Sequence, residues 1–196
     1  MNKIQRWSLT WILLIGACAP SKDGVSPRGE QEKGAVDLVL EAKAKLGEGA
    51  LWDSETQQLW WVDIEGRLLH IFDPATGNDR VIGLPSRVGT VVKTRQGAAL
   101  VALESGIYHL NLATEELRLV INPLDTLPGF RFNDGKCDPE GRFWVGSMMM
   151  QQQQPMASLY CLHTNGVIKQ VLTGVTISNG IVWNHAKTKN VVCRHS

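Results

Sequence analysis

From Ala35 onward, apolar residues occur in short runs separated by clusters of turn-forming residues. The runs are rich in β-branched and aromatic residues, which favour β-strands. Residues 73–77 (DPATG) and 95–97 (RQG) are examples of the clusters between the runs. No stretch has apolar residues at a helical spacing over a useful length. The pattern therefore predicts an all-β domain, with a first strand at 36–40.

The predicted strands recur in groups of four. The first group begins at Glu48 and ends near residue 82, and similar groups start again later in the chain. The glycines at the starts of the groups are Gly49, Gly89, Gly135 and Gly180, which stand 40, 46 and 45 residues apart. A four-stranded repeat of about 40 to 50 residues is typical of a β-propeller blade. The sequence therefore predicts a propeller with three blades and the start of a fourth.

The stretch from Phe130 to Met148 carries the densest set of polar residues among apolar ones. Residues 133–135 (NDG) have the composition of a turn, and taken alone they predict a hairpin or loop turn. Residues 137–141 (CDPEG) predict a second turn, and 142–146 (RFWVG) predict a short strand. The stretch therefore leads into a predicted strand pair at the lip of a sheet.

Three polar residues stand at equivalent positions in this repeat. The first strand of each propeller blade lines the central channel, so a residue just before that strand lies at one end of the channel. Glu48, Asn133 and Asn179 each precede a predicted first strand, and we expect them to converge. One carboxylate and two amide oxygens form a hard oxygen site suited to calcium or magnesium.

The overall composition is that of a soluble globular protein with a substantial core. Of the 196 residues, 43% are apolar and 20% are charged, and the formal net charge is +1. Neither sign of charge dominates, so nothing points to nucleic acid as a partner. The five histidines show no metal-ligand spacing, and the chain has no Gly-rich phosphate loop.

The first residues predict export. Residues 2–6 are basic, and 7–17 form an apolar run shorter than the ~20 residues that span a membrane. The run ends in Ile15-Gly16-Ala17-Cys18, which resembles the bacterial lipoprotein box. We therefore predict a signal peptide at 1–18, a flexible tether at 19–34 and a propeller domain at 35–196.

In this interpretation Cys18 carries the lipid, and the anchor is the protein's only contact with the membrane. The protein would lie in the bacterial cell envelope, facing the periplasm or the cell exterior. The alternative is ordinary secretion with an incidental Cys18. Cys137, Cys161 and Cys193 remain in the mature part without a CxxC spacing. Cys137 and Cys161 are interpreted as small buried residues, and a disulfide between them is left open.

Several motifs together resemble the family of gluconolactonases, regucalcin (senescence marker protein) and luciferin-regenerating enzymes. They are 46–53 (LGEGALWD), 61–64 (WVDI), 131–136 (RFNDGK), 138–142 (DPEGR), 146–148 (GSM) and 177–180 (ISNG). The resemblance extends from about Leu46 to Trp183. It implies a six-bladed propeller with one divalent metal ion at the channel mouth, calcium in the first place and zinc or magnesium as alternatives.

The resemblance also implies roles for single residues. Glu48 and Asn179 would be metal ligands, and Arg131 and Asn133 would contact the substrate. Counted from Arg131, Gln151 takes the place of a family glutamate that reaches the sugar. Gln151 would therefore contact the substrate through an oxygen atom but without the negative charge of the glutamate. The family's remaining metal-binding aspartate, which is also the proposed acid/base, belongs to a later blade, so no catalytic residue is assigned within the chain.

The chain would therefore hold about the first three to three and a half of six blades. We expect a truncated or frameshifted product, or a fragment of a longer gene, that needs a complementing C-terminal half of the propeller. The predicted function is metal-dependent hydrolysis of a sugar lactone by Lewis-acid activation, impaired in this chain. The alternatives are a non-catalytic, surface-anchored binding module and a hydrolase of another cyclic ester or a phosphotriester.

Overall fold

A computed structural model describes residues 37–151, 154–186 and 189–195. The predicted signal peptide, the tether and Cys18 lie outside the described residues, so export and lipidation stay predictions. All strands belong to one compact unit, Leu38–Ser196. No helix in the described part of the chain is long and apolar enough to cross a membrane.

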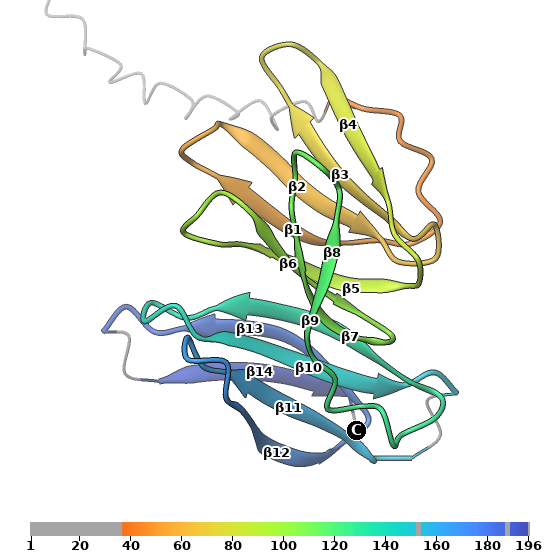
Figure 1. The fold of residues 1–196 in the computed structure, drawn as a ribbon, viewed down its shortest axis with the longest axis vertical. Helices are drawn as coiled ribbons and strands as arrows, with labels where there is room; N and C mark the ends of the chain where they lie inside the picture. The colour runs from red at the N-terminus through yellow and green to blue at the C-terminus, as the bar shows by residue number, and fades with distance from the viewer. Residues whose placement is uncertain (1–36, 152–153, 187–188, 196) are drawn as a thin grey trace, which may run out of the picture. The chain divides into compact units, whose positions relative to one another are not determined.

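Antiparallel strands form three successive sheets along the chain, two of four strands and a third of six (Figure 1). The first contains β1 (Gly47–Asp53), β2 (Gln58–Asp63), β3 (Leu68–Asp73) and β4 (Asn78–Gly83). The second contains β5 (Val88–Lys93), β6 (Ala99–Leu103), β7 (Gly106–Leu110) and β8 (Leu117–Ile121). The third contains β9 (Phe130–Cys137), β10 (Phe143–Met149), β11 (Ala157–Leu162) and β12 (Ile168–Val175).

Two further strands, β13 (Ile177–Trp183) and β14 (Asn190–His195), form a hairpin. The hairpin joins the third sheet through one residue pair, Met148 of β10 with Ile177 of β13. The first strands β1, β5, β9 and β13 contain the four repeated glycines of the sequence. The predicted succession of three blades and the start of a fourth is thus confirmed.

Two local predictions were wrong. Residues 37–44 form no strand, and Leu38 and Val39 are 80% and 74% exposed. Asn133-Asp134-Gly135 lies inside β9 and not in a turn, because Gly135 pairs with Val145 and lets the two strands approach. A Cβ atom at Gly135 would lie 2.5 Å from the carbonyl oxygen of Trp144. Composition alone does not distinguish a glycine needed for close approach from one needed for a turn.

Side chains of turn-forming residues close several of the turns between strands. In five of them an aspartate or asparagine accepts a hydrogen bond from the backbone N–H two residues later. These residues are Asp53, Asp73, Asn111, Asp138 and Asn165. Asp73 and Asp138 stand in turns that the sequence predicted, and there a side chain fixes the backbone.

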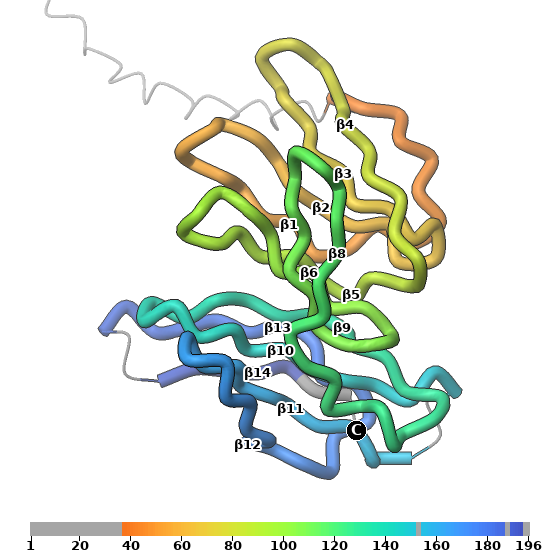
Figure 2. Tube along the Cα trace, viewed as in Figure 1, coloured from red at the N-terminus to blue at the C-terminus, as the bar shows by residue number. Residues whose placement is uncertain are grey.

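Both faces of β5 and β6 in the second sheet are buried, and successive residues point to opposite sides. Val91 and Val101 belong to a hydrophobic cluster shared with the first sheet. Their neighbours Val92 and Ala102 belong to a cluster shared with the third sheet, which contains Phe132. This alternation follows from the two-residue period of a strand. The second sheet, green in the chain trace of Figure 2, accordingly lies between the other two.

The first strands β5 and β9 approach closely at Gly89. A Cβ atom there would lie 2.5 Å from the carbonyl oxygen of Phe132 and 2.6 Å from that of Asn133. Both obstacles are backbone atoms, which cannot rotate away as a side chain can.

We therefore expect Gly89→Ala to lower the free energy of unfolding by about 3 kcal/mol. Gly83→Ala is the control, since nothing lies within 4 Å of a Cβ atom built at Gly83, and it should change stability by less than about 0.5 kcal/mol. Urea unfolding followed by tryptophan fluorescence measures both. Equal stability of the two variants would contradict the close approach of β5 and β9.

Candidate functional site

The first strands start at the same end of their sheets. The last residues of β1 and β5, Asp53 and Lys93, form an ion pair of 2.7 Å, which places the ends of these two strands together. Away from that end, Asn133, the fourth residue of β9, reaches the backbone of Ser178, the second residue of β13. We call the end where the first strands start the site end. Because neighbouring strands are antiparallel, the β2–β3 and β6–β7 turns return to it.

Arg131 and Asn133 form a buried pair at the site end. Arg131 is 7% exposed and Asn133 is 8% exposed. The Nη1 atom of Arg131 donates to the Asn133 Oδ1 atom and to the Phe132 carbonyl oxygen, both at 2.9 Å. These two bonds fix the plane of the guanidinium group. Sequence reasoning placed both residues in the site, and the structure brings them into contact.

The charges around Arg131 come from four other segments. Burial lowers the pKa of Arg131, and the nearby charge of Arg87 acts in the same direction. The carboxylates of Glu65, Glu104 and Glu48 oppose the shift. Glu48, which the sequence predicted to be a metal ligand, is thus close enough to act electrostatically on Arg131. It is an exposed residue of β1 opposite Val62.

Asn179 is held next to this pair by its neighbours in the chain. Asn133 Nδ2 donates to the carbonyl oxygen of Ser178 at 3.0 Å. On the other side of Asn179, the backbone N–H of Gly180 donates to Asp134 Oδ2 at 3.0 Å. Both residues that flank Asn179 are therefore bonded to side chains of β9, and the predicted neighbourhood of Asn133 and Asn179 is present in the structure.

The segment that leads into Glu48 is fixed by Asp63, a residue that sequence reasoning did not assign to the site. The two carboxylate oxygens of Asp63 accept the backbone N–H groups of Lys45, Leu46 and Gly66, each at 3.0 Å. Burial acts to raise the pKa of Asp63, but these donors outweigh it and hold the pKa below its usual value. The only indication of this role in the sequence was a single acidic residue, Asp63, at the end of an apolar predicted strand.

An ion-pair network also lies at the site end and was not predicted. Arg87, just before β5, donates from Nε to both carboxylate oxygens of Glu65 at 2.9 Å and from Nη1 to Glu104 at 2.9 Å. Hydrogen bonds from Arg87 to these two glutamates raise its pKa. The sulfur of Met150 lies 3.8 Å from Arg87 Nη1. Loops of all three sheets therefore meet here.

Gln151, predicted to contact the substrate, follows Met150 at this end and is exposed. In the described part of the chain no hydrogen bond joins Gln151 to Arg131 or Asn133. The structure thus brings Met150, the neighbour of Gln151, to the network around Arg87.

The described residues contain no group of three or more His, Cys, Asp or Glu residues that could hold a metal ion. Glu48 and Asn179 offer one carboxylate and one amide oxygen, which are the donor types that calcium and magnesium take. The Oδ1 atom of Asn133 is already bonded to Arg131. The donors fit a hard cation in kind, and a complete set of ligands needs others besides these two.

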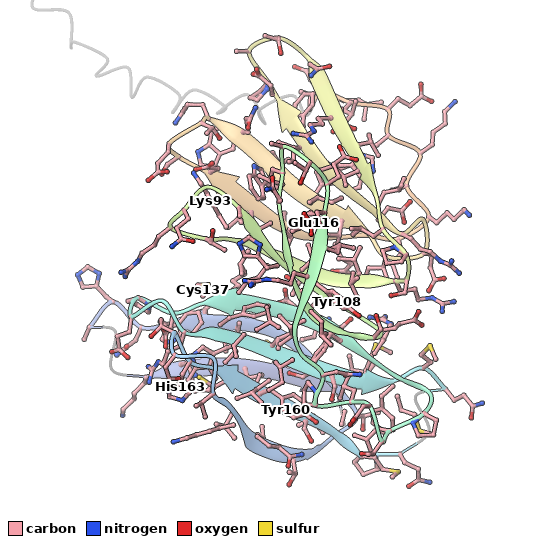
Figure 3. The ribbon with its side chains drawn as sticks, in the orientation of Figure 1. Lys93, Tyr108, Glu116, Cys137, Tyr160 and His163 are labelled. Atoms are coloured by element: carbon pink, nitrogen blue, oxygen red, sulfur yellow. The ribbon has the colours of Figure 1, made fainter. Side chains whose placement is uncertain are left out.

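The opposite end of the first strands has a different character. Lys93 and Cys137, labelled in Figure 3, line a cavity of about 210 Å³ between β1, β5 and β9. Desolvation and the nearby Asp138 raise the pKa of the Cys137 thiol to about 11, although part of the residue is exposed.

The expectation that Cys137 is buried was wrong, whereas Cys161 is buried. Cys137, Cys161 and Cys193 are free thiols, so the pairing left open between Cys137 and Cys161 does not occur.

Residues 46–192 match the family model described as "SMP-30/Gluconolactonase/LRE-like region". The YvrE protein of Bacillus subtilis is 40% identical over 154 residues, which are 78% of this chain and 53% of YvrE. A 6-deoxy-6-sulfogluconolactonase of Pseudomonas putida is 34% identical over 80% of this chain and 56% of its own length. The chain thus spans about half the length of the curated relatives it matches.

The fold is similar to that of a calcium-binding protein, regucalcin, from Agrobacterium tumefaciens, with a TM-score of 0.76 and 28% identity. The match covers 80% of this chain and 52% of the regucalcin chain. It confirms the predicted fold class, an all-β propeller of the lactonase type of which part is present.

The bonds of Asp63 predict a dependence of stability on pH. Its lowered pKa stabilises the folded chain above the unfolded value of about 3.9, and this contribution is lost as the pH falls through the folded pKa. Asp63→Asn should cost about 2 kcal/mol at pH 7, because a neutral amide offers one acceptor oxygen to three donors.

The difference between wild type and Asp63→Asn should shrink between pH 5 and pH 3, both measured by urea unfolding. Asp125→Asn, at an exposed loop position, provides the control. A difference that stays constant over this pH range would show that the carboxylate of Asp63 is not what holds the segment before Glu48.

Proposed function

The chain belongs to the SMP-30/gluconolactonase/LRE-like family, and on this premise we propose that its site end takes part in the hydrolysis of a sugar lactone. The proposal rests above all on one observation, the buried Arg131–Asn133 pair directly beside the backbone of Ser178. A relative named for lactone hydrolysis, the 6-deoxy-6-sulfogluconolactonase, supports the same class of substrate.

In this proposal Arg131 binds oxygen atoms of the substrate. A lactone derived from a sugar carries hydroxyl groups and a carbonyl oxygen, all of which accept hydrogen bonds. Asn133 and the Phe132 carbonyl hold the guanidinium group through Nη1, and its other N–H groups are the proposed donors to the lactone. Because the group is buried and fixed, little conformational freedom is lost when the substrate binds.

Glu48 and Asn179 are the proposed holders of a divalent cation. Calcium is the first choice because both donors are hard oxygens, and magnesium and zinc are the alternatives. When bound, such a cation supplies Lewis-acid polarisation of the ester carbonyl. Gln151 is kept as a proposed contact to the substrate. No acid/base residue is assigned in the described part of the chain, so we expect slow hydrolysis from this chain by itself.

We also propose that a further sheet of a lactonase-type propeller covers the outer face of the first sheet. That face borders an apolar cavity of about 590 Å³, lined by Leu59, Trp61 and Phe72 of the sheet, with Glu48 at the same cavity. Val39, Leu40 and Ala42, from the segment before β1, line it as well. Trp61 is stacked on His70 with ring centroids 3.8 Å apart, and His70 bonds to Asp79 at 2.6 Å. The wall that the sheet gives to the cavity is thus largely apolar, as the buried faces between the other sheets are.

The cation proposal predicts the effect of Glu48→Gln, which removes a charge and keeps the size of the side chain. Calcium affinity measured by titration calorimetry should fall by at least about tenfold, because the charge of the ligands sets the affinity of such sites. The hydrolysis rate of gluconolactone with added calcium, followed in a pH-stat, should fall in parallel.

Glu116→Gln is the matched control, since this exposed glutamate lies in the β7–β8 turn at the opposite end of the second sheet. It should leave both affinity and rate unchanged. Calcium binding or hydrolysis that is insensitive to Glu48→Gln would contradict the assignment of Glu48.

The docking proposal predicts complementation. The half of the Pseudomonas putida lactonase that this chain does not span, produced as a separate polypeptide, should raise the hydrolysis rate above the sum of the two separate chains. Trp61→Lys should abolish the gain, because it introduces a charge into the apolar face, while Trp52→Lys, at a position 48% exposed, should not. A mixture no more active than its parts would count against this docking face.

A further inference from the structure

Two consecutive side chains of β9 bind the backbone on the two sides of Asn179. Asn133 holds the Ser178 carbonyl oxygen, and Asp134 accepts from the Gly180 N–H, both at 3.0 Å. Among the described residues, β9 pairs with β10 and β13 pairs with β14 and with one residue of β10. The strands β9 and β13 are therefore joined by side-chain bonds rather than by a backbone ladder.

The Gly180 N–H group has a second acceptor nearby. It lies 3.1 Å from the Oδ1 atom of Asn179, the same atom that is proposed to bind the cation. Asp134 and Asn179 thus share one donor in a three-centre bond. An ionised carboxylate is the stronger acceptor of the two, so Asp134 takes the greater part of this bond. The bond from the Gly180 N–H group to the amide oxygen of Asn179 is weakened accordingly.

Gly180 has a backbone conformation that the bond from Asp134 helps to fix. Its φ angle is +59°, in the left-handed region that glycine adopts at little cost. A free glycine would also populate other conformations. When the Gly180 N–H group is bonded to Asp134, the peptide between Asn179 and Gly180 keeps one orientation. The Cα–Cβ bond of Asn179 then also keeps one direction.

We propose that Asp134 is a positioning residue, which holds the Asn179–Gly180 peptide and leaves the Asn179 Oδ1 atom available to a hard cation. The inference deepens the proposed function, on which its second half rests. Asp63 is a parallel on the first sheet, because its carboxylate holds the N–H groups of Lys45 and Leu46 just before Glu48. Each proposed ligand would thus have its strand fixed by a carboxylate from a different strand.

The test uses the whole chain and two substitutions. Asp134→Ala removes the acceptor, whereas Asp134→Asn removes the charge and keeps an oxygen that can accept from Gly180. In the chain without added metal, amide hydrogen exchange at Gly180 is measured by NMR. Asp134→Ala should speed the exchange by about tenfold, and Asp134→Asn should stay within about threefold of wild type. Amide signals of the first sheet report whether each variant is folded.

Calcium titration of the same proteins gives the second readout. Asp134→Ala should weaken binding by about tenfold or more, the usual cost of removing a residue that orients a ligand, and Asp134→Asn should weaken it less. Glu116→Ala is the control and should change neither readout.

Exchange at Gly180 that is unchanged in Asp134→Ala overturns the proposal. Equal loss of calcium affinity in Asp134→Asn and Asp134→Ala also overturns it, because charge alone would then matter. A wild-type chain that takes up no calcium refutes the proposed role of Asn179. The exchange result then still decides whether Asp134 holds the peptide.

Discussion

The side-chain hydrogen bonds between first strands of successive blades are the interaction on which the site depends. Thr90 Oγ1 of β5 donates to the Gly135 carbonyl of β9 at 3.0 Å, and Asn133 of β9 donates to the Ser178 carbonyl of β13. Both bonds are buried, where a polar group without a partner would cost about 1–3 kcal/mol. The apolar clusters hold the sheets together, but these directed bonds set which residues of neighbouring first strands lie side by side.

This arrangement explains why polar residues gather where the first strands start. The first strands β5 and β9 approach closely at Gly89, so the side chains near their starts project into a small space. A guanidinium group can be buried there only because its charge is compensated. Arg131 meets carbonyl and amide oxygens directly and the charges of nearby glutamates at longer range. The fold therefore supplies a buried, oriented hydrogen-bond donor beside an asparagine whose backbone is tied on both sides.

Much of the fold could be predicted from the sequence because the repeat is local. Glycines and turn residues recur at the blade period, and Arg131 and Asn133 are two residues apart on one strand, so their contact needed no long-range information. The bonds of Arg87 to Glu65 and Glu104 join loops of different sheets, and no spacing in the chain announces them. Glycine composition suggested a turn at Gly135, where the structure has a strand. What the sequence did not reveal was the set of bonds between sheets.

The central claim is that Glu48 and Asn179 meet at one end of the first strands. Manganese, added as a paramagnetic substitute for calcium, tests it most directly through the amide signals of the labelled chain. The account predicts that one equivalent of manganese broadens the signals of Glu48 and Asn179 together and leaves those of Lys93 and Cys137, at the opposite end, sharp. Broadening at only one of the two strands, or first at Lys93 and Cys137, would contradict the claim.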